Sequence, residues 1–252
     1  MSHYGVVVIT KTNPDESWNS EIDDILAPYS EHIKVPEYVS RTKQELIDLA
    51  KRKAETIKEN LANGKFTEEE WMKPYLKAKT DNDFYQCMVD KHQKYNENGD
   101  ELSTYNPESR WDYWSEGRPW PEPMDDEDTV VTVGTFKKYF IDFNKMSDED
   151  LKEKYKKDLR NYKKLLKDGD GWYNLEYLKR RYPTFRDYLK MRYLPWLVAI
   201  VDANGWYEAG KVGWFATIDA TPEQEAAWVD EFFKRIFEYD DNLFASCIDC
   251  HI

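Results

Sequence analysis

Short apolar runs stand near both ends of the chain, and patterns with helical spacing fill the middle. Residues 4–10 are rich in β-branched side chains and are followed by Asn13-Pro14, so the sequence predicts a buried strand there. Similar runs predict strands at residues 129–133, 196–201 and 243–252. The turn residues Ala203-Asn204-Gly205 predict a hairpin that leads into a further strand beginning at Trp206.

Side-chain caps mark the predicted starts of four helices. The capping pairs are Thr42 with Glu45, Thr67 with Glu70, Ser147 with Asp150, and Thr221 with Gln224. They predict helices over about 42–63, from 67, over about 147–167 and over about 221–237. Helical spacing predicts another helix at about 81–95 and one or two short helices between 174 and 193. Residues 105–128 hold four prolines and three tryptophans. Their apolar positions follow neither the period of 2 of a strand nor the period of 3.6 of a helix, which predicts a long ordered loop.

The order of these elements predicts an α+β fold. Strands cluster at both ends, so the N- and C-terminal strands are expected to form one antiparallel or mixed sheet. A ferredoxin-like core with a large helical insertion fits that order. We therefore predict one domain over residues 1–252, with helical insertions at about 42–95 and 137–192.

Composition narrows the class of protein. The chain has 252 residues, a formal net charge of −13 and a mean hydropathy of −0.87. No apolar run reaches the roughly 18 residues of a membrane span, and no leader pattern precedes the first strand. A cytoplasmic protein is predicted, in the host cytoplasm if a phage encodes it, with its three cysteines reduced and no membrane partner.

Charge is unevenly distributed along the chain. Residues 137–192 hold 17 basic and 10 acidic side chains, whereas both flanking regions are acidic. A binder of duplex nucleic acid usually carries a dominant basic field, so that function is excluded. The basic segment predicts either a solvated helix face with internal ion pairs or a local positive wall for a small anion or an acidic protein.

The C-terminal sequence Cys247-Ile248-Asp249-Cys250-His251 matches the attachment pattern for c-type haem. In a strand, however, the two cysteines point to opposite faces, because three residues is an odd step at a period of two. A zinc site would need further ligands, for which Cys87 and His92 are the distant candidates. Strand parity instead places Cys247, Asp249 and His251 on one face, which predicts a histidine supported by an aspartate or a hydrogen-bonded strand edge. No metal or cofactor is predicted.

The aromatic loop contains the side chains that a nucleotide-like ligand requires: flat rings for stacking, one guanidinium and directional acceptors. Its candidate ligand-binding residues are Asn106, Trp111, Asp112, Trp114, Arg118 and Trp120. The hairpin adds Trp206 and Trp214, and the chain ends add His3, Asp249 and His251. A loop that roofs the core and aromatic packing around the hairpin are the alternatives for these same residues.

Several short patches resemble a family of uncharacterised tailed-phage proteins. They include Asn106-Pro107-x-Ser109-x-Trp111-Asp112-x-Trp114, Gly117-Arg118-x-Trp120, Gly213-Trp214-Phe215 and the ending Asp249-Cys250-His251-Ile252. Near Arg118 the chain departs from the family, which commonly has Gly-Gly-Arg-Trp there. Cys247 has no counterpart in the family's ending. The resemblance implies a phage origin and brings no established activity.

Three functions remain open. The leading hypothesis is a phage accessory protein, with an anti-defence role, that sequesters a small anionic nucleotide-derived ligand between the aromatic loop and the hairpin. A second is a hydrolase of a phosphodiester or glycosidic bond, in which His251 or His3 acts as general acid or base beside Asp249 or Asp112. A third is an acidic inhibitor of a host defence protein. An exposed sheet edge would permit a homodimer.

Overall fold

The computed structural model describes the chain except at residues 1–2, 15–19, 117–128, 172, 194–196 and 213–217. The described chain forms two compact units, the first made of Met1–Ile33 with Pro107–Ile252 and the second of Lys34–Asn106. One domain is expected from the sequence, but residues 34–106 have apolar clusters of their own and a small sheet of their own.

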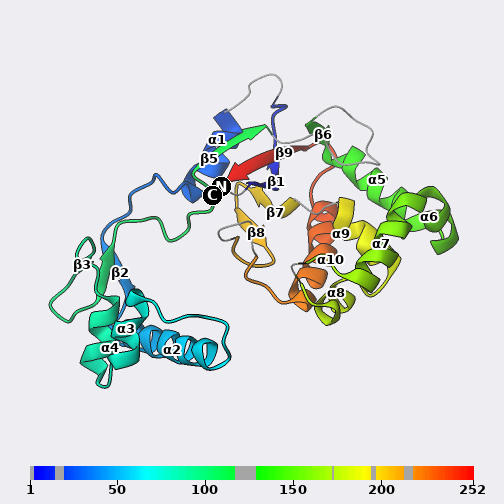
Figure 1. Cartoon of the computed structure of the whole chain (residues 1–252). Helices are drawn as coiled ribbons and strands as arrows, with labels where there is room; N and C mark the ends of the chain where they lie inside the picture. The colour runs from blue at the N-terminus through cyan, green and yellow to red at the C-terminus, as the bar shows by residue number, and fades with distance from the viewer. Residues whose placement is uncertain (1–2, 15–19, 117–128, 172, 194–196, 213–217) are drawn as a thin grey trace. The chain divides into compact units, whose positions relative to one another are not determined.

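The first unit is built on a mixed sheet whose central strands come from the two ends of the chain (Figure 1). The strands are β1 (His3–Thr10), β5 (Tyr113–Glu116), β6 (Val130–Thr132), β7 (Leu197–Asp202), β8 (Gly205–Glu208) and β9 (Phe244–His251). Their order is β5-β9-β1-β7-β8, and β6 also pairs with β9. β1 is antiparallel to β9 and parallel to β7. The expected mixed α and β composition and the sharing of one sheet by both chain ends are confirmed.

A ferredoxin-like core is not confirmed. Neighbouring strands in that core are antiparallel, whereas here β1 lies beside β7 in the parallel direction. β8, which forms the hairpin with β7, lies at the edge of the sheet. A parallel neighbour requires a crossover connection, and in this chain the crossover from β1 to β7 includes α1, the second unit and several helices.

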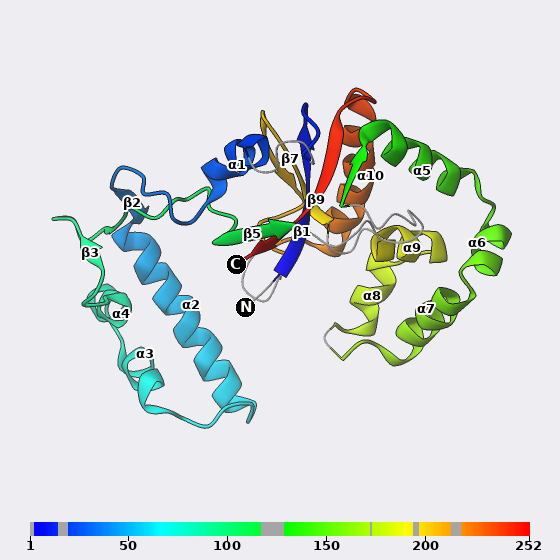
Figure 2. The ribbon, with the colours of Figure 1, turned by 90° about the horizontal axis from the view of Figure 1, so that it is seen from above.

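Helices cover both faces of this sheet (Figure 2). α1 (Ser20–Leu26) packs Ile22, Ile25 and Leu26 against one face. α5 (Val133–Lys145) and α10 (Pro222–Glu238) cover the other through Phe136, Phe232 and neighbouring apolar side chains. Each large side chain buried in this way contributes about 1.5–3 kcal/mol. The two faces of β1 are consequently both buried, as its β-branched run predicts.

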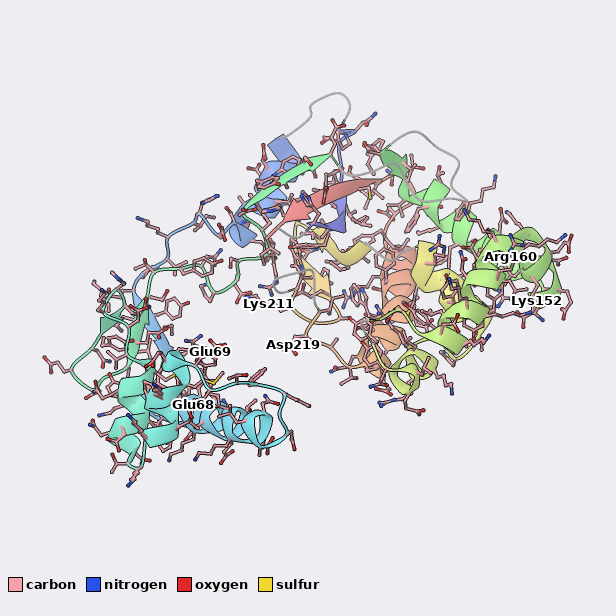
Figure 3. The ribbon with its side chains drawn as sticks, viewed as in Figure 1. Glu68, Glu69, Lys152, Arg160, Lys211 and Asp219 are labelled. Carbon is pink, nitrogen blue, oxygen red and sulfur yellow. The ribbon has the colours of Figure 1, made fainter. Side chains whose placement is uncertain are left out.

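The lysine-rich segment forms a helical layer with its own small apolar cluster. Its helices are α6 (Asp148–Lys154), α7 (Lys156–Asp168), α8 (Leu175–Arg181) and α9 (Phe185–Tyr193). The predicted capping box at Ser147 is present, but the single predicted helix divides at Tyr155, whose ψ of 45° departs from helical geometry. Tyr155 is buried against Leu151 and Leu189, so packing decides the break. Figure 3 shows Lys152 on α6 and Arg160 on α7, two of the exposed basic side chains of this layer.

The second unit contains three α-helices and a three-stranded sheet in its described residues. Its elements are β2 (Tyr38–Arg41), α2 (Lys43–Ala62), α3 (Lys73–Lys77), α4 (Asp81–Met88), β3 (Lys94–Tyr95) and β4 (Glu101–Ser103). The capping box of Thr42 and Glu45 is confirmed at the start of α2. Thr67 is not a cap, because helical structure begins at the short 3₁₀ turn Glu70–Met72. α4 ends at Met88 rather than near 95, where Lys94 and Tyr95 pair with β4.

Part of the predicted loop 105–128 is a strand. β5 pairs with β9 along the register Tyr113↔His251 to Glu116↔Ile248. Four residues at a sheet edge are too few to display a clear period, and the pairing with β9 supplies the order that the local pattern lacks. Among the described residues, no helix combines the length and the apolar character needed to cross a membrane.

Candidate functional site

Three rings lie side by side where β5, β9 and β1 meet at one end of the sheet. The register places Tyr113 opposite His251 and His251 opposite His3. Directly opposed residues on neighbouring strands share a face, so all three side chains project from the same surface. The Tyr113 ring stacks on the His251 ring at 4.3 Å between centroids, and the His3 ring meets His251 edge-on at 5.0 Å. We refer to His3, His251, Asp112 and Asp249 as the two-histidine site.

The buried histidine, His251, is held by Asp112. Its Nδ1 lies 2.6 Å from Oδ1 of Asp112. The same carboxylate oxygen accepts a hydrogen bond from the backbone N–H of Tyr113 at 2.6 Å, and the N–H of Asp112 donates to the carbonyl of His251 at 2.9 Å. The strand pairing of β5 with β9 thus aims the carboxylate at the imidazole.

The exposed histidine, His3, has a carboxylate of its own. Its Nδ1 lies 3.1 Å from Oδ2 of Asp249, two positions before His251 on β9. Asp249 stands opposite Gly5, which has no side chain to occupy the space. The carboxylate can therefore reach diagonally along the face to the next residue pair.

These pairings set the protonation pattern of both rings. An ionised carboxylate only accepts hydrogen bonds, so each Nδ1 carries a proton toward its aspartate. In the neutral imidazole, Nε2 then bears the lone pair and can act as a base, and in the cation it can act as an acid. Two carboxylate-oriented imidazoles 5.0 Å apart form a pair suited to moving protons on and off one bound molecule.

The two rings differ sharply in exposure. The side chain of His251 is 4% exposed, and that of His3 is 53% exposed. Nε2 of His251 is buried without a hydrogen-bond partner in the described part of the chain. A buried polar atom without a partner costs about 1–3 kcal/mol. Less than 1 Å² of this nitrogen is accessible, so a ligand atom reaches it only where neighbouring side chains move aside.

The C-terminal cysteines take no part in this site. Cys247 packs in the cluster under α10 and Cys250 in the cluster under α1, so the predicted opposite faces are confirmed. Burial, with the charge of Asp249, raises the pKa of both thiols. A buried neutral thiol is a poor nucleophile and metal ligand. Within the described residues, no group of three or more His, Cys, Asp or Glu side chains is placed to hold a metal ion.

The predicted stacking tryptophans lie on the other face of the sheet. Trp114 stands opposite Cys250 and, with Trp111 and Trp206, packs against the α1 cluster. The indole N–H of Trp111 donates to the carbonyl of Leu26 at 3.1 Å. Trp206 packs on Tyr29 at 5.0 Å between ring centroids and donates to Glu208 at 2.9 Å. These three indoles pack on the core, and Trp111 and Trp114 also line an open depression along β5. Their role in stacking on a ligand stays a prediction.

An ion pair joins the aromatic loop to the hairpin. Nε of Arg110 donates to Oε1 of Glu208 at 2.9 Å, and both side chains are largely buried. Lys211 donates from Nζ to the carbonyl of Pro107 at 3.2 Å, and burial together with the charge of Arg110 lowers its pKa. Figure 3 shows Lys211 and Asp219 at the end of the hairpin, where the Asp219 N–H donates to the Lys211 carbonyl.

The remaining predicted site residues divide into two groups. Arg118, Trp120 and Trp214 lie outside the described residues. Asn106 is buried at the end of the second unit, whereas the two-histidine site belongs to the first.

Sequence reasoning missed Tyr113 and Arg110. Tyr113 is 47% exposed and stacks on His251. The sequence pattern did not predict a strand at Tyr113, so it could not predict which face of the sheet this side chain occupies. Had residues 113–116 been recognised as a strand, the alternation of Tyr113 with Trp114 would have placed them on opposite faces. Arg110 offered no local signal, because its partner Glu208 lies 98 residues away.

An open depression of about 570 Å³ follows β5 beside the two-histidine site. Its lining combines the aromatic residues Trp111, Tyr113 and Trp114 with Asp23, Asp112, Ser115 and Glu116. The carboxylate charges would repel an anion that bound along the strand itself.

In comparisons with known proteins, no family model, no curated protein and no solved structure matches the chain.

Proposed function

We propose that the protein is a phosphodiester hydrolase in which His3 and His251 act as the general acid and general base. The observation that carries the proposal is the pair of imidazole rings 5.0 Å apart, each with its Nδ1 on a separate aspartate. That arrangement leaves two Nε2 atoms to exchange protons with one substrate.

The two rings take different roles. Once the side chains that bury Nε2 of His251 move aside, that nitrogen takes a proton from the attacking water. When protonated, His3, which is exposed and paired with Asp249, donates its Nε2 proton to the leaving alkoxide. Water and a phosphodiester become a phosphomonoester and an alcohol, and exchange with solvent resets both rings. Asp112 and Asp249 orient the rings and offset the charge of each imidazolium.

A phosphodiester substrate is favoured over a glycoside because the groups proposed to transfer protons are imidazoles and not carboxylates. Glycosidases generally use two carboxylates that act on the sugar directly. Here both carboxylates are engaged by imidazole Nδ1 atoms. Protonated imidazole additionally supplies positive charge to a phosphate, which the surrounding acidic side chains do not.

The proposal is tested by assaying turnover of bis(p-nitrophenyl) phosphate and of a panel of cyclic nucleotides, dinucleotides and ADP-ribose derivatives. His3→Ala and His251→Ala should each lower kcat by about 10²–10⁴-fold, because each removes one proton transfer. His92→Ala is the matched control, since His92 is exposed in the second unit and should leave kcat unchanged.

The same panel separates hydrolysis from sequestration, the function expected first from the sequence. A nucleotide that raises Tm without yielding product would support sequestration and overturn hydrolysis. Arg118→Ala then tests the predicted phosphate contact. A phage origin and an anti-defence role rest on the resemblance of the sequence patches and stay proposals.

A further inference from the structure

The outer side of α7 carries a concentration of positive charge. The helix turns Leu159, Tyr162 and Leu165 into the apolar cluster of the helical layer. Five basic side chains lie on the opposite side, because at 3.6 residues per turn they fall within an arc of roughly 120°. All five are exposed. We refer to them as the α7 basic face: Lys157, Arg160, Lys163, Lys164 and Lys167.

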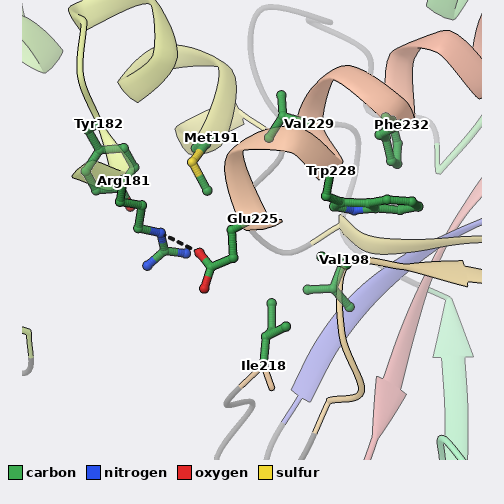
Figure 4. Close-up of a pocket in the computed structure, with 10 residues that line it drawn as sticks. Arg181, Tyr182, Met191, Val198, Ile218, Glu225, Trp228, Val229 and Phe232 are labelled. Carbon is green, nitrogen blue, oxygen red and sulfur yellow. Dashed lines mark ion pairs between the residues drawn. The ribbon is translucent and has the colours of Figure 1, made fainter. Parts of the chain in front are cut away.

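Other cations of this layer hold its helices in place. Nε of Arg181 on α8 lies 2.7 Å from Oε2 of Glu225 on α10, the ion pair drawn in Figure 4. Similar pairs join the helices of the layer to one another and to α10: Arg180–Glu223, Arg186–Asp148, Lys190–Asp230 and Arg192–Asp158. No member of the α7 basic face forms an ion pair with a described residue. Its charge is therefore available to a partner.

This arrangement of charge is unfavourable for the free protein. On a helix, residues three or four positions apart are neighbours, and like charges at these positions repel each other. Five pairs within the α7 basic face stand at one of these two separations, among them Arg160 with Lys157 and with Lys164. An anionic surface laid on the face offsets the repulsion, so the pattern favours a binding surface over a face that is only solvated.

The spacing of the cations fits an acidic helix. Four members of the face form a line about 15 Å long, at spacings of three, four and three residues: Lys157, Arg160, Lys164 and Lys167. A second helix presents a matching row of carboxylates when Asp or Glu recurs every three or four residues. Opposed rows of this kind pair charge with charge between two helices, as the flanking positions of coiled coils do.

Two other anionic surfaces fit less well. A helix that lies on a membrane inserts apolar side chains beside its lysines, whereas Leu159, Tyr162 and Leu165 pack inward. A site for single-stranded nucleic acid combines cations with aromatic side chains, and the α7 basic face contains none. The formal net charge of −13 also repels a long polyanion. These observations favour a protein partner whose negative charge is local.

We propose that the α7 basic face is the docking surface for an acidic helix of a partner protein. The surface is distinct from the two-histidine site, and the proposal does not depend on hydrolytic activity. Carboxylates of the partner pair with the exposed cations and remove the repulsion within α7. Because exposed charges are screened by salt, the affinity falls as ionic strength rises.

The test uses two fluorescein-labelled helical peptides of alanine and glutamine that contain four glutamates each. In the first peptide the glutamates stand at spacings of three, four and three residues, so they form one row. In the second they are distributed around all sides of the helix. Fluorescence anisotropy should show that the first peptide binds about 5-fold more tightly than the second, with an affinity that falls as salt is added. Equal affinities would overturn the proposal.

Two variants with the same change of net charge make the test specific. The first combines Lys157→Gln, Arg160→Gln, Lys164→Gln and Lys167→Gln, which keeps good helix formers on α7 and removes the like-charge neighbours. It should lose binding of the first peptide and unfold at no lower urea concentration than the wild type. The control replaces four exposed lysines of the second unit and should bind like the wild type: Lys58→Gln, Lys65→Gln, Lys77→Gln and Lys91→Gln. Undiminished binding by the α7 variant would contradict the assignment.

The same proteins distinguish the classes of partner. Vesicles of phosphatidylserine with phosphatidylcholine, and a single-stranded oligothymidylate, are titrated against the wild type and the α7 variant. Both should bind the wild type more weakly than the first peptide does. Tighter binding of either one, lost in the α7 variant, would assign the face to a membrane or to nucleic acid and overturn the proposal of an acidic helix.

Discussion

At the scale of single residues, the structure repeatedly satisfies a buried or half-buried carboxylate with a donor from a distant element. Asp112 accepts from the ring of His251, and Glu225 accepts from the hydroxyl of Tyr177. A hydrogen bond to a charged group contributes about 1.5–3 kcal/mol where it is shielded from water. Such donors are therefore sites at which stability depends on protonation.

Tyr177 gives a test of this dependence. Burial of its hydroxyl, with the charge of Glu225, raises the pKa of Tyr177 from 10.0 to about 12. Its contribution to stability is complete below pH 10 and is lost as the pH rises toward 12, because the unfolded chain releases the proton first. We expect the difference in urea midpoint between the wild type and Tyr177→Phe to fall between about pH 9 and about pH 12.

Other tyrosines do not obscure this measurement. Tyr4 and Tyr239 also have raised pKa values, from burial foremost, but they are present in both proteins and cancel in the difference. Tyr173→Phe removes the hydroxyl of the ring stacked on Tyr177, so it measures how much of the pH dependence comes from that neighbour. A difference for Tyr177→Phe that stays constant across the range would contradict the assigned role.

At the scale of elements, the β7–β8 hairpin depends on close backbone approach where it returns toward α10. The N–H of Asp219 donates to the carbonyl of Lys211 at 3.1 Å, which draws the two backbone segments together. Gly210 stands at this point, and an added Cβ would overlap the carbonyl oxygen of Asp219. Backbone cannot move aside as a flexible side chain can, so glycine is required for steric reasons.

Gly210→Ala should therefore lower the free energy of unfolding by about 1–3 kcal/mol. Gly205→Ala is the matched control on the same hairpin, because a Cβ there would make only ordinary contacts with the Tyr207 ring. Urea denaturation of both variants measures the effect. Equal stabilities for the two variants would show that the segment after Lys211 shifts freely.

At the scale of the whole first unit, a few contacts join segments that are far apart in the chain. Arg110 on the aromatic loop pairs with Glu208 on β8 and also donates to the carbonyls of Glu108 and Ser109. The Tyr4 hydroxyl on β1 donates to the carbonyl of Arg110. The loop is thus attached to an edge strand and to a central strand of the sheet.

A double-mutant cycle measures the first of these attachments. Arg110→Met and Glu208→Gln should each cost about 1–3 kcal/mol, with a coupling of at least about 1 kcal/mol, because removing one partner leaves the other charge poorly compensated. Glu108→Gln is the control, since the Glu108 side chain is 67% exposed and lies 3.8 Å from Arg110. Additive losses would mean that the ion pair does not hold the loop.

Much of the local architecture follows from the sequence. The capping boxes at Thr42, Ser147 and Thr221 are present, and the hairpin turn at Ala203-Asn204-Gly205 joins β7 to β8. These features act over three or four residues, so neighbouring residues alone determine them. The parity that puts Cys247 and Cys250 on opposite faces of β9 is determined in the same way.

Tertiary structure alone decided what stands beside those elements. The sequence contains both aspartates and both histidines of the two-histidine site, but not the pairing of His251 with Asp112 and of His3 with Asp249 across 139 and 246 positions. That pairing depends on the register of three strands, as does the burial of Trp111 under α1. Register is a property of the assembled sheet, because a slip of one residue would move every side chain to the other face.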